Sequence, residues 1–141
     1  MNKESKATLN RFLDAQASSY GQALSEIKGG RKRSHWMWFI FPQLKGLGYS
    51  ETARFFAIDD LQEAQLYLQH PVLGPRLVEI SKAMLALEGK TANQILGYPD
   101  DLKLRSSVTL FAAIPGADPV FKAVLDKYYN GEADEQTLQL L

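Results

Sequence analysis

The sequence predicts an all-α fold: one compact, mainly helical domain over residues 1–141, with about seven helices and room for one or two very short strands. Apolar side chains recur every three or four residues along much of the chain, which places them on one face of a helix. Residues that cap helices, such as Ser, Thr and Asp, precede these stretches, and glycine follows several of them. A hydrophobic fraction of 45% and a charged fraction of 23% are typical of a chain that buries one core.

Four helices are expected in the first half of the chain. The first is the longest, and Gly29-Gly30 ends it because glycine adopts the left-handed conformation without a Cβ clash. The aromatic segment that follows fits either a short helix or a buried strand, and its helical surroundings favour the helix. Ser50 caps the third helix, and Asp60 with Glu63 has the capping-box pattern for the fourth. The expected ranges are 9–27, 36–41, 50–57 and 61–69.

The second half begins with an apolar stripe from Leu73 to Leu87, which predicts a long helix. Thr91 opens a second capping-box pattern for a single helical turn. Residues 101–114 alternate like a strand but also fit a helix packed through small side chains, which we prefer. Pro119 suits the first turn of another helix, and Asp134 caps a terminal one. The leucines of this last helix that we expect to dock on the core are Leu138, Leu140 and Leu141.

The composition excludes several classes of site. The chain has no cysteine, so a disulfide, a thiolate metal site and a cysteine nucleophile are all impossible. Its two histidines, His35 and His70, have no second ligand at helical spacing, so we expect no metal, and no motif indicates a cofactor. The N-terminus lacks the apolar core of a signal peptide, and the longest apolar run is too short to span a bilayer. We therefore expect a cytoplasmic protein without membrane contact.

Charge is balanced over the whole chain but not along it. Sixteen basic and sixteen acidic residues cancel, which argues against nucleic acid as a partner. Residues 1–48 carry eight Lys or Arg against three Asp or Glu, whereas residues 118–141 carry two against five. An anion site is therefore expected near the N-terminal third.

The segment 31–36 contains the first group of candidate site residues. Two glycines precede it, and the forks of Arg31 and Arg33 with the hydroxyl of Ser34 suit a phosphate or a carboxylate. Trp36 offers a ring on which a base can stack, and His35 beside the cations suits a neutral acid or base. The alternative is a solvated basic loop whose neighbouring aromatic side chains build the core.

A second polar cluster interrupts the ambiguous segment of the second half. Lys103, Arg105 and Ser106 lie among apolar residues, so the arginine needs an anionic partner, either a nearby carboxylate or a bound ligand. Asp101 is the second candidate for moving protons. We expect this cluster to meet the segment 31–36 and to line one pocket with it.

The motif RKRSHWMWFIFPQ at residues 31–43, with Leu47-Gly48, closely resembles the bacterial family catalogued as domain of unknown function 1810. The resemblance continues at HPVLG, residues 70–74, and at DDLKLRSS, residues 100–107, and it covers essentially the whole chain. It implies a small helical domain, and Gln43, which ends the first motif, joins the candidate ligand-binding residues. Some members carry the label calpastatin, but that inhibitor is a long disordered chain, whereas this sequence has the composition of a packed domain.

The family is also distantly similar to the NADAR, or YbiA-like, domains, which are associated with ADP-ribose derivatives and related N-glycosides. This similarity implies a ligand class but maps no catalytic carboxylate onto the chain. The leading hypothesis is a protein that binds or processes a phosphorylated ribose or ADP-ribose-like metabolite in a basic, aromatic-lined pocket, with hydrolysis of an N-glycoside or ADP-ribose derivative as the enzymatic form. The alternative is a non-enzymatic protein-interaction module that uses the basic loop 28–35, in a monomer or a weak homodimer. Binding of RNA or single-stranded nucleic acid is a weaker third.

Overall fold

The computed structural model describes the backbone of residues 3–141 and the side chains from Leu9 onward, and this part of the chain forms ten α-helices and no β-strand. The predicted helical class is confirmed, but about seven helices is too few. Three of the ten are only four or five residues long. The helices are α1 Lys3–Ala17, α2 Tyr20–Lys28, α3 Met37–Ile40, α4 Glu51–Phe55, α5 Leu61–Gln69, α6 Leu73–Ala86, α7 Ala92–Leu96, α8 Asp100–Ala112, α9 Val120–Tyr129 and α10 Glu135–Leu140.

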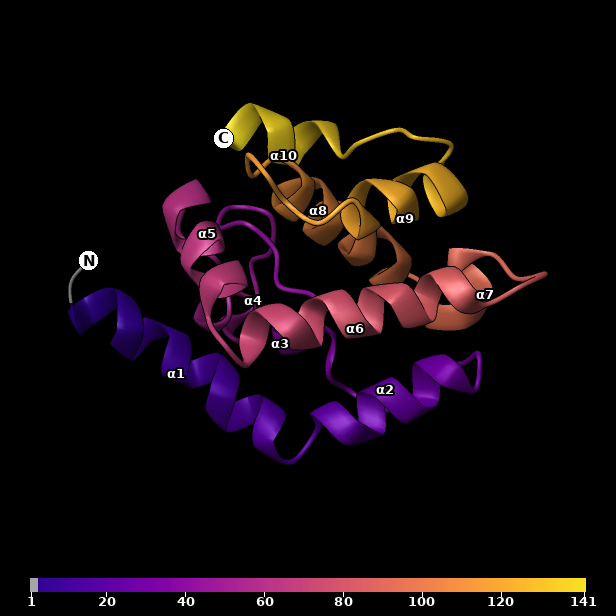
Figure 1. Cartoon of the computed structure of the whole chain (residues 1–141), viewed down its shortest axis with the longest axis horizontal. Helices are drawn as coiled ribbons and strands as arrows, with labels where there is room; N and C mark the ends of the chain where they lie inside the picture. Colours follow the sequence, from indigo (N-terminus) through magenta and orange to yellow (C-terminus); the bar gives the residue numbers. More distant parts are fainter. Residues whose placement is uncertain (1–2) are drawn as a thin grey trace.

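The single helix predicted over 9–27 is divided into α1 and α2, which enclose a wide angle (Figure 1). The break falls at Ser18 and Ser19, where the amide of Ser19 donates to the carbonyl of Gln16 at 3.2 Å. Serine competes with the helix for backbone hydrogen bonds, so it tolerates such a turn. The break lets α1 pack on α3 and α5 while α2 packs on α6.

The aromatic segment forms the short helix α3, and the alternative of a strand there is wrong. Met37, Phe39 and Ile40 of α3 and Phe41 after it are all buried. The only β-like feature recorded for the described residues is one isolated parallel bridge, from Leu44 to Ile58. This bridge ties the loop after α3 to the segment between α4 and α5.

Helix α6 crosses the middle of the molecule and packs on α2, α5 and α9 (Figure 1). Its predicted stripe is buried, with Leu77 at 2% exposure and Ile80 at 0%. Gly74 allows the close approach to α5, because a Cβ at this position would lie 2.0 Å from the carbonyl oxygen of Leu68. The predicted role of this stripe in the core is therefore confirmed.

Two helix starts differ in how completely the predicted capping box forms. At α7 the box is complete, since Thr91 and Gln94 each accept a hydrogen bond from the other's backbone amide. At α5 the Asp60 carboxylate accepts the amide of Glu63 at 2.8 Å, but the Glu63 carboxylate accepts the amide of Asp59 instead of that of Asp60. Glu63 also pairs with Arg11 of α1 at 3.3 Å, which draws it away from the reciprocal contact.

The ambiguous segment 101–114 is helical, as preferred, and forms α8. Residues 106–111 of α8 are all buried, so this helix lies in the core and packs on α5, α7, α9 and α10. The last helix docks on the core, but not through the predicted residues. Its docking side chain is the buried Thr137, whereas the leucines remain between 43% and 52% exposed: Leu138, Leu140 and Leu141.

Candidate ligand-binding pocket

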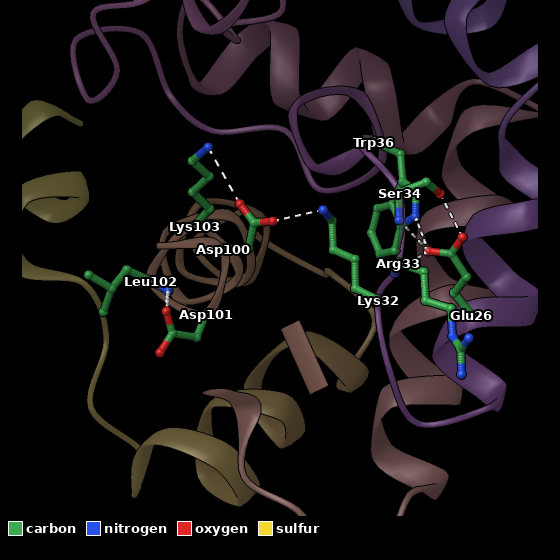
Figure 2. Close-up of polar contacts among 9 residues, drawn as sticks. All are labelled: Glu26, Lys32, Arg33, Ser34, Trp36, Asp100, Asp101, Leu102 and Lys103. Atoms are coloured by element: carbon green, nitrogen blue, oxygen red, sulfur yellow. Dashed lines mark hydrogen bonds and ion pairs between the residues drawn. The ribbon is translucent and has the colours of Figure 1, made fainter. Parts of the chain in front are cut away.

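The carboxylate of Glu26 anchors the basic loop between α2 and α3 through hydrogen bonds, as Figure 2 shows. One oxygen accepts the amides of Arg33 and Ser34, at 2.7 and 3.1 Å, and the indole N–H of Trp36 at 2.9 Å. The other oxygen accepts the Ser34 hydroxyl at 2.6 Å. Burial raises the pKa of Glu26, but these four hydrogen bonds favour the ionised form more strongly and lower the pKa to about 2. The loop is therefore built around an ionised carboxylate.

This anchoring decides where the first group of predicted site residues points. The side chains of Arg31, Arg33 and His35 are exposed, and they form no hydrogen bond or ion pair with residues 9–141. Trp36 is only 1% exposed, so its ring packs in the core and its N–H is used by Glu26. Ser34 is likewise engaged with Glu26.

The first group and the second polar cluster meet at the carboxylate of Asp100 (Figure 2). Nζ of Lys32 lies 2.9 Å from Oδ2, and Nζ of Lys103 lies 3.5 Å from Oδ1. Each lysine also lies over an aromatic ring at 5.1 Å from its centroid, Lys32 over Trp36 and Lys103 over Trp38. The two segments are thus brought together through Lys32, but they do not line one pocket. Lys103, Arg105 and Ser106 line one cavity, and Arg31 and Lys32 line another.

The first of these, which we name the α8 pocket, has a volume of about 440 Å³. Its walls come from the loop after α3 and the start of α4, within residues 43–53, from residues 99–106 around the start of α8, and from Asp134 and Gln136 near the C-terminus. This volume lies within the range of roughly 300–1,000 Å³ that small-molecule sites occupy. Four of the predicted ligand-binding residues line it: Gln43, Lys103, Arg105 and Ser106.

Arg105 fixes one wall of the α8 pocket by binding the chain before α10. Its Nε donates to the carbonyl of Glu132 at 2.8 Å, and its Nη2 donates to the carbonyl of Ala133 at 3.2 Å. The Glu132 carboxylate lies 3.7 Å away and is 75% exposed. Two of the five N–H donors of Arg105 are therefore engaged with backbone carbonyls, so this side chain shapes the pocket wall as well as offering charge to it.

Ser106 joins the same wall to the first turn of α10. Its hydroxyl donates to Oδ2 of Asp134 at 3.1 Å, and that oxygen also accepts the amide and the hydroxyl of Thr137. The Asp134 amide in turn donates to Oγ1 of Thr109 at 2.8 Å. Asp134, a cap predicted from the sequence, therefore also positions α10 beside the pocket.

Tyr49 is a pocket residue that the sequence analysis did not identify. It lies between Gly48 and the helix cap Ser50, and its side chain is 78% exposed at the rim of the α8 pocket. Leu102, 47% exposed, supplies a second apolar surface there. The signal in the sequence was a tyrosine in a short glycine-containing loop, because an aromatic side chain in such a loop is rarely needed for the core.

The second pocket, which we name the α7 pocket, lies between Arg31-Lys32 and residues 89–97 and has a volume of about 530 Å³. The two predicted proton-transfer residues line neither pocket. Asp101 accepts the amide of Leu102 at 2.9 Å and contacts the side-chain amide of Asn93 at 3.4 Å, while His35 faces solvent. Their catalytic roles remain predictions.

Two features of the described residues bear on the class of site. The structure places no group of three or more His, Cys, Asp or Glu side chains where they could share a metal ion. None of its helices has the length and apolar character needed to cross a bilayer.

Comparisons with known proteins agree with the fold. The family model described as "Protein of unknown function (DUF1810)" matches residues 6–141. The crystal structure of the conserved hypothetical protein Rv1873 from Mycobacterium tuberculosis is similar, with a TM-score of 0.93 and 51% sequence identity over 94% of this chain and 95% of that chain. A search of curated proteins finds no significant match.

Proposed function

Because this chain belongs to the family described as Protein of unknown function (DUF1810), whose description assigns no activity, we propose its function from the α8 pocket: it binds a phosphorylated ribose or an ADP-ribose-like metabolite there. The observation that carries this proposal is the pairing of a cation and an exposed aromatic ring on one pocket. Lys103 supplies the cation, and Tyr49 supplies the ring.

The charges around the α8 pocket favour a ligand that carries few negative charges. Lys103 is held by Asp100 at 3.5 Å, a long ion pair that leaves its other N–H donors for a phosphate. Asp134 lines the same pocket but already accepts three hydrogen bonds. The phosphoryl group of a ribose phosphate or the diphosphate of ADP-ribose is therefore better matched to this pocket than a longer polyphosphate.

The remaining lining groups suit a sugar with an attached ring. The side-chain amides of Gln43 and Gln136 can donate to and accept from ribose hydroxyls. Tyr49 offers one face for stacking, worth roughly 1–3 kcal/mol for a nucleobase. The proposal is one of binding, since neither His35 nor Asp101 lines this pocket.

Isothermal titration calorimetry with ribose 5-phosphate, ADP-ribose and unphosphorylated ribose tests the proposal. Lys103→Ala should weaken binding of both phosphorylated ligands about tenfold, because a charge-assisted hydrogen bond is lost. Lys82→Ala, an exposed lysine on α6, is the matched control. Tyr49→Ala should weaken the binding of ADP-ribose more than that of ribose 5-phosphate. Its control is Tyr98→Ala, because Tyr98 is 77% exposed and Tyr49 is 78% exposed.

Two results would overturn the proposal. The first is a wild-type protein that binds none of the phosphorylated ligands. The second is equal loss of affinity in Lys103→Ala and Lys82→Ala, which would mean that general surface charge attracts the ligand. Preserved unfolding midpoints in all four variants would show that any loss of affinity is local.

The exposure of Arg31, Arg33 and His35 favours a second candidate, a protein-interaction surface formed by the loop 28–35. Glu26 holds the backbone of this loop, so its cations are presented on a fixed support. The acidic segment 118–141 of a second copy is a partner of matching charge. Sedimentation equilibrium tests this candidate: Arg33→Glu should abolish a salt-sensitive dimer, and a wild-type protein that is monomeric at low salt would exclude it.

A further inference from the structure

All charged side chains that line the α7 pocket are positive. Arg31, Lys32 and Lys90 contribute three cations, and Asn93 and Gln94 contribute two side-chain amides. Among the described residues that line it there is no Asp or Glu. Cations that share one cavity repel each other, and a bound anion relieves this repulsion. We infer that the α7 pocket is a second binding site, distinct from the α8 pocket, for a phosphate or for the phosphoryl group of a small phosphomonoester.

The pocket is held in shape by long-range hydrogen bonds between its two sides. The amide of Lys32 donates to the carbonyl of Ile95 at 2.7 Å, and Nζ of Lys90 donates to the carbonyl of Gly30 at 2.9 Å. Gly30 has φ of +83°, and a Cβ on it would lie 2.8 Å from Nζ of Lys90. The left-handed glycine therefore makes room for the lysine, and the lysine is positioned at the pocket before any ligand binds.

The three cations differ in how far they are already neutralised. Lys32 is paired with Asp100, and its side chain is only 9% exposed. Lys90 uses one of its three N–H donors on Gly30, which is a neutral acceptor. Arg31 is exposed, and its guanidinium group has no partner among residues 9–141. Arg31 and Lys90 are thus the two charges that an incoming anion would neutralise.

The amides add directional donors to this charge. Gln94 accepts the Thr91 amide through its side-chain oxygen, so its NH₂ group remains available. An arginine fork, an ammonium group and an amide NH₂ together match the several acceptor oxygens of a phosphoryl group. A carboxylate has only two oxygens and would leave donors of this set unused.

We propose to test the site with inorganic phosphate and glycerol 3-phosphate as ligands. Two-dimensional ¹H–¹⁵N NMR at constant ionic strength would detect their binding. The amide signals of Gly89 and Gly97, which line the pocket, should shift and saturate. Stronger binding of the ester would mean that the site takes the phosphoryl group of a larger ligand, and equal binding would mean that it takes the free anion. Either result supports the site.

The two arginines of the same loop provide a matched comparison. Both are exposed, but Arg31 lines the α7 pocket and Arg33 does not. Arg31→Ala should weaken phosphate binding about tenfold, and Lys90→Gln should do the same, while Arg33→Ala should leave it nearly unchanged. Tyr49→Ala, an uncharged change in the α8 pocket, should also leave phosphate binding in the α7 pocket unchanged, so this inference can be tested independently of the proposed function.

Three outcomes would overturn the inference. Signals of Gly89 and Gly97 that do not respond to either probe would show that the pocket binds no phosphoryl group. Equal weakening by Arg31→Ala and Arg33→Ala would assign the effect to the general charge of the loop. Shifts confined to Gly48, which lines the α8 pocket, would place the anion there instead.

Discussion

Nζ of Lys32 lies 2.9 Å from Oδ2 of Asp100, and this contact joins the basic loop to the first turn of α8. Both side chains are largely covered, at 9% and 18% exposure. Because water reaches them poorly, the attraction between them is screened less than that of a surface pair. The same carboxylate also meets Lys103, so one acidic side chain pairs with a lysine of each pocket.

Asp100→Asn should therefore lower the free energy of unfolding by roughly 1–3 kcal/mol, the cost of losing hydrogen bonds to a charged group. Asp126→Asn is the matched control, since Asp126 is 56% exposed and its partner Lys122 is 72% exposed. That variant should lose less than about 1 kcal/mol. Urea denaturation measures both, and equal losses would contradict the special role of Asp100.

Glu26→Gln should destabilise the protein more at pH 7 than at pH 3. The pKa of Glu26 is lowered from 4.5 to about 2 in the folded protein, because the hydrogen bonds from the loop outweigh burial. The ionised carboxylate therefore adds its full stability above about pH 4.5, and this stability is lost as the pH falls towards 2. Urea titrations of both proteins between pH 3 and pH 7 measure the difference, and a difference that grows on acidification would refute the prediction.

Leu77→Ala and Leu125→Ala should each lower the free energy of unfolding by roughly 2–5 kcal/mol, since each would leave a cavity in the core. The two side chains are 2% and 5% exposed. Leu138→Ala provides the control, because Leu138 is 50% exposed and should lose less than about 1 kcal/mol. Chemical denaturation measures all three variants, and similar losses at all three positions would be inconsistent with the observed core.

Asp134→Ala should detach α10 without unfolding the rest of the chain. The carboxylate caps this helix and also holds Ser106 of α8, so its removal should cost roughly 0.5–2 kcal/mol. Hydrogen exchange should then accelerate at the amides of α10 and not at those of α6. Asp60→Ala, which removes the cap of α5, is the control that should leave α10 protected.

Local patterns in the sequence predicted the helices well where the signal lies within one turn. Thr91 with Gln94 forms the capping box that their spacing indicates, and the stripe from Leu73 is buried along α6. The break at Ser18 and Ser19 was not predictable in this way. The apolar pattern runs on through it, and the two halves turn apart because they pack on different neighbours.

The candidate site was predictable in its cations but not in its aromatic groups. Lys103 and Arg105 stand out because charges in an apolar segment need partners. The sequence around Trp36 and Trp38 does not show which of the two side chains is buried. Trp36 is buried because Glu26, one helix earlier, accepts its indole N–H, and Tyr49 reaches the pocket because a loop carries it there.

The carboxylate of Glu26 occupies the place that a loop of this composition would offer to an external anion. The amides of Arg33 and Ser34, the Ser34 hydroxyl and the Trp36 indole are the donors that would cradle a phosphate, and all of them already hold a group of the chain itself. The protein thus carries an internal ligand that, as part of the same chain, competes for these donors at a high effective concentration. For the proposed anion sites this leaves side chains at the edge of the loop, such as Arg31, because the backbone donors of Arg33 and Ser34 are already engaged.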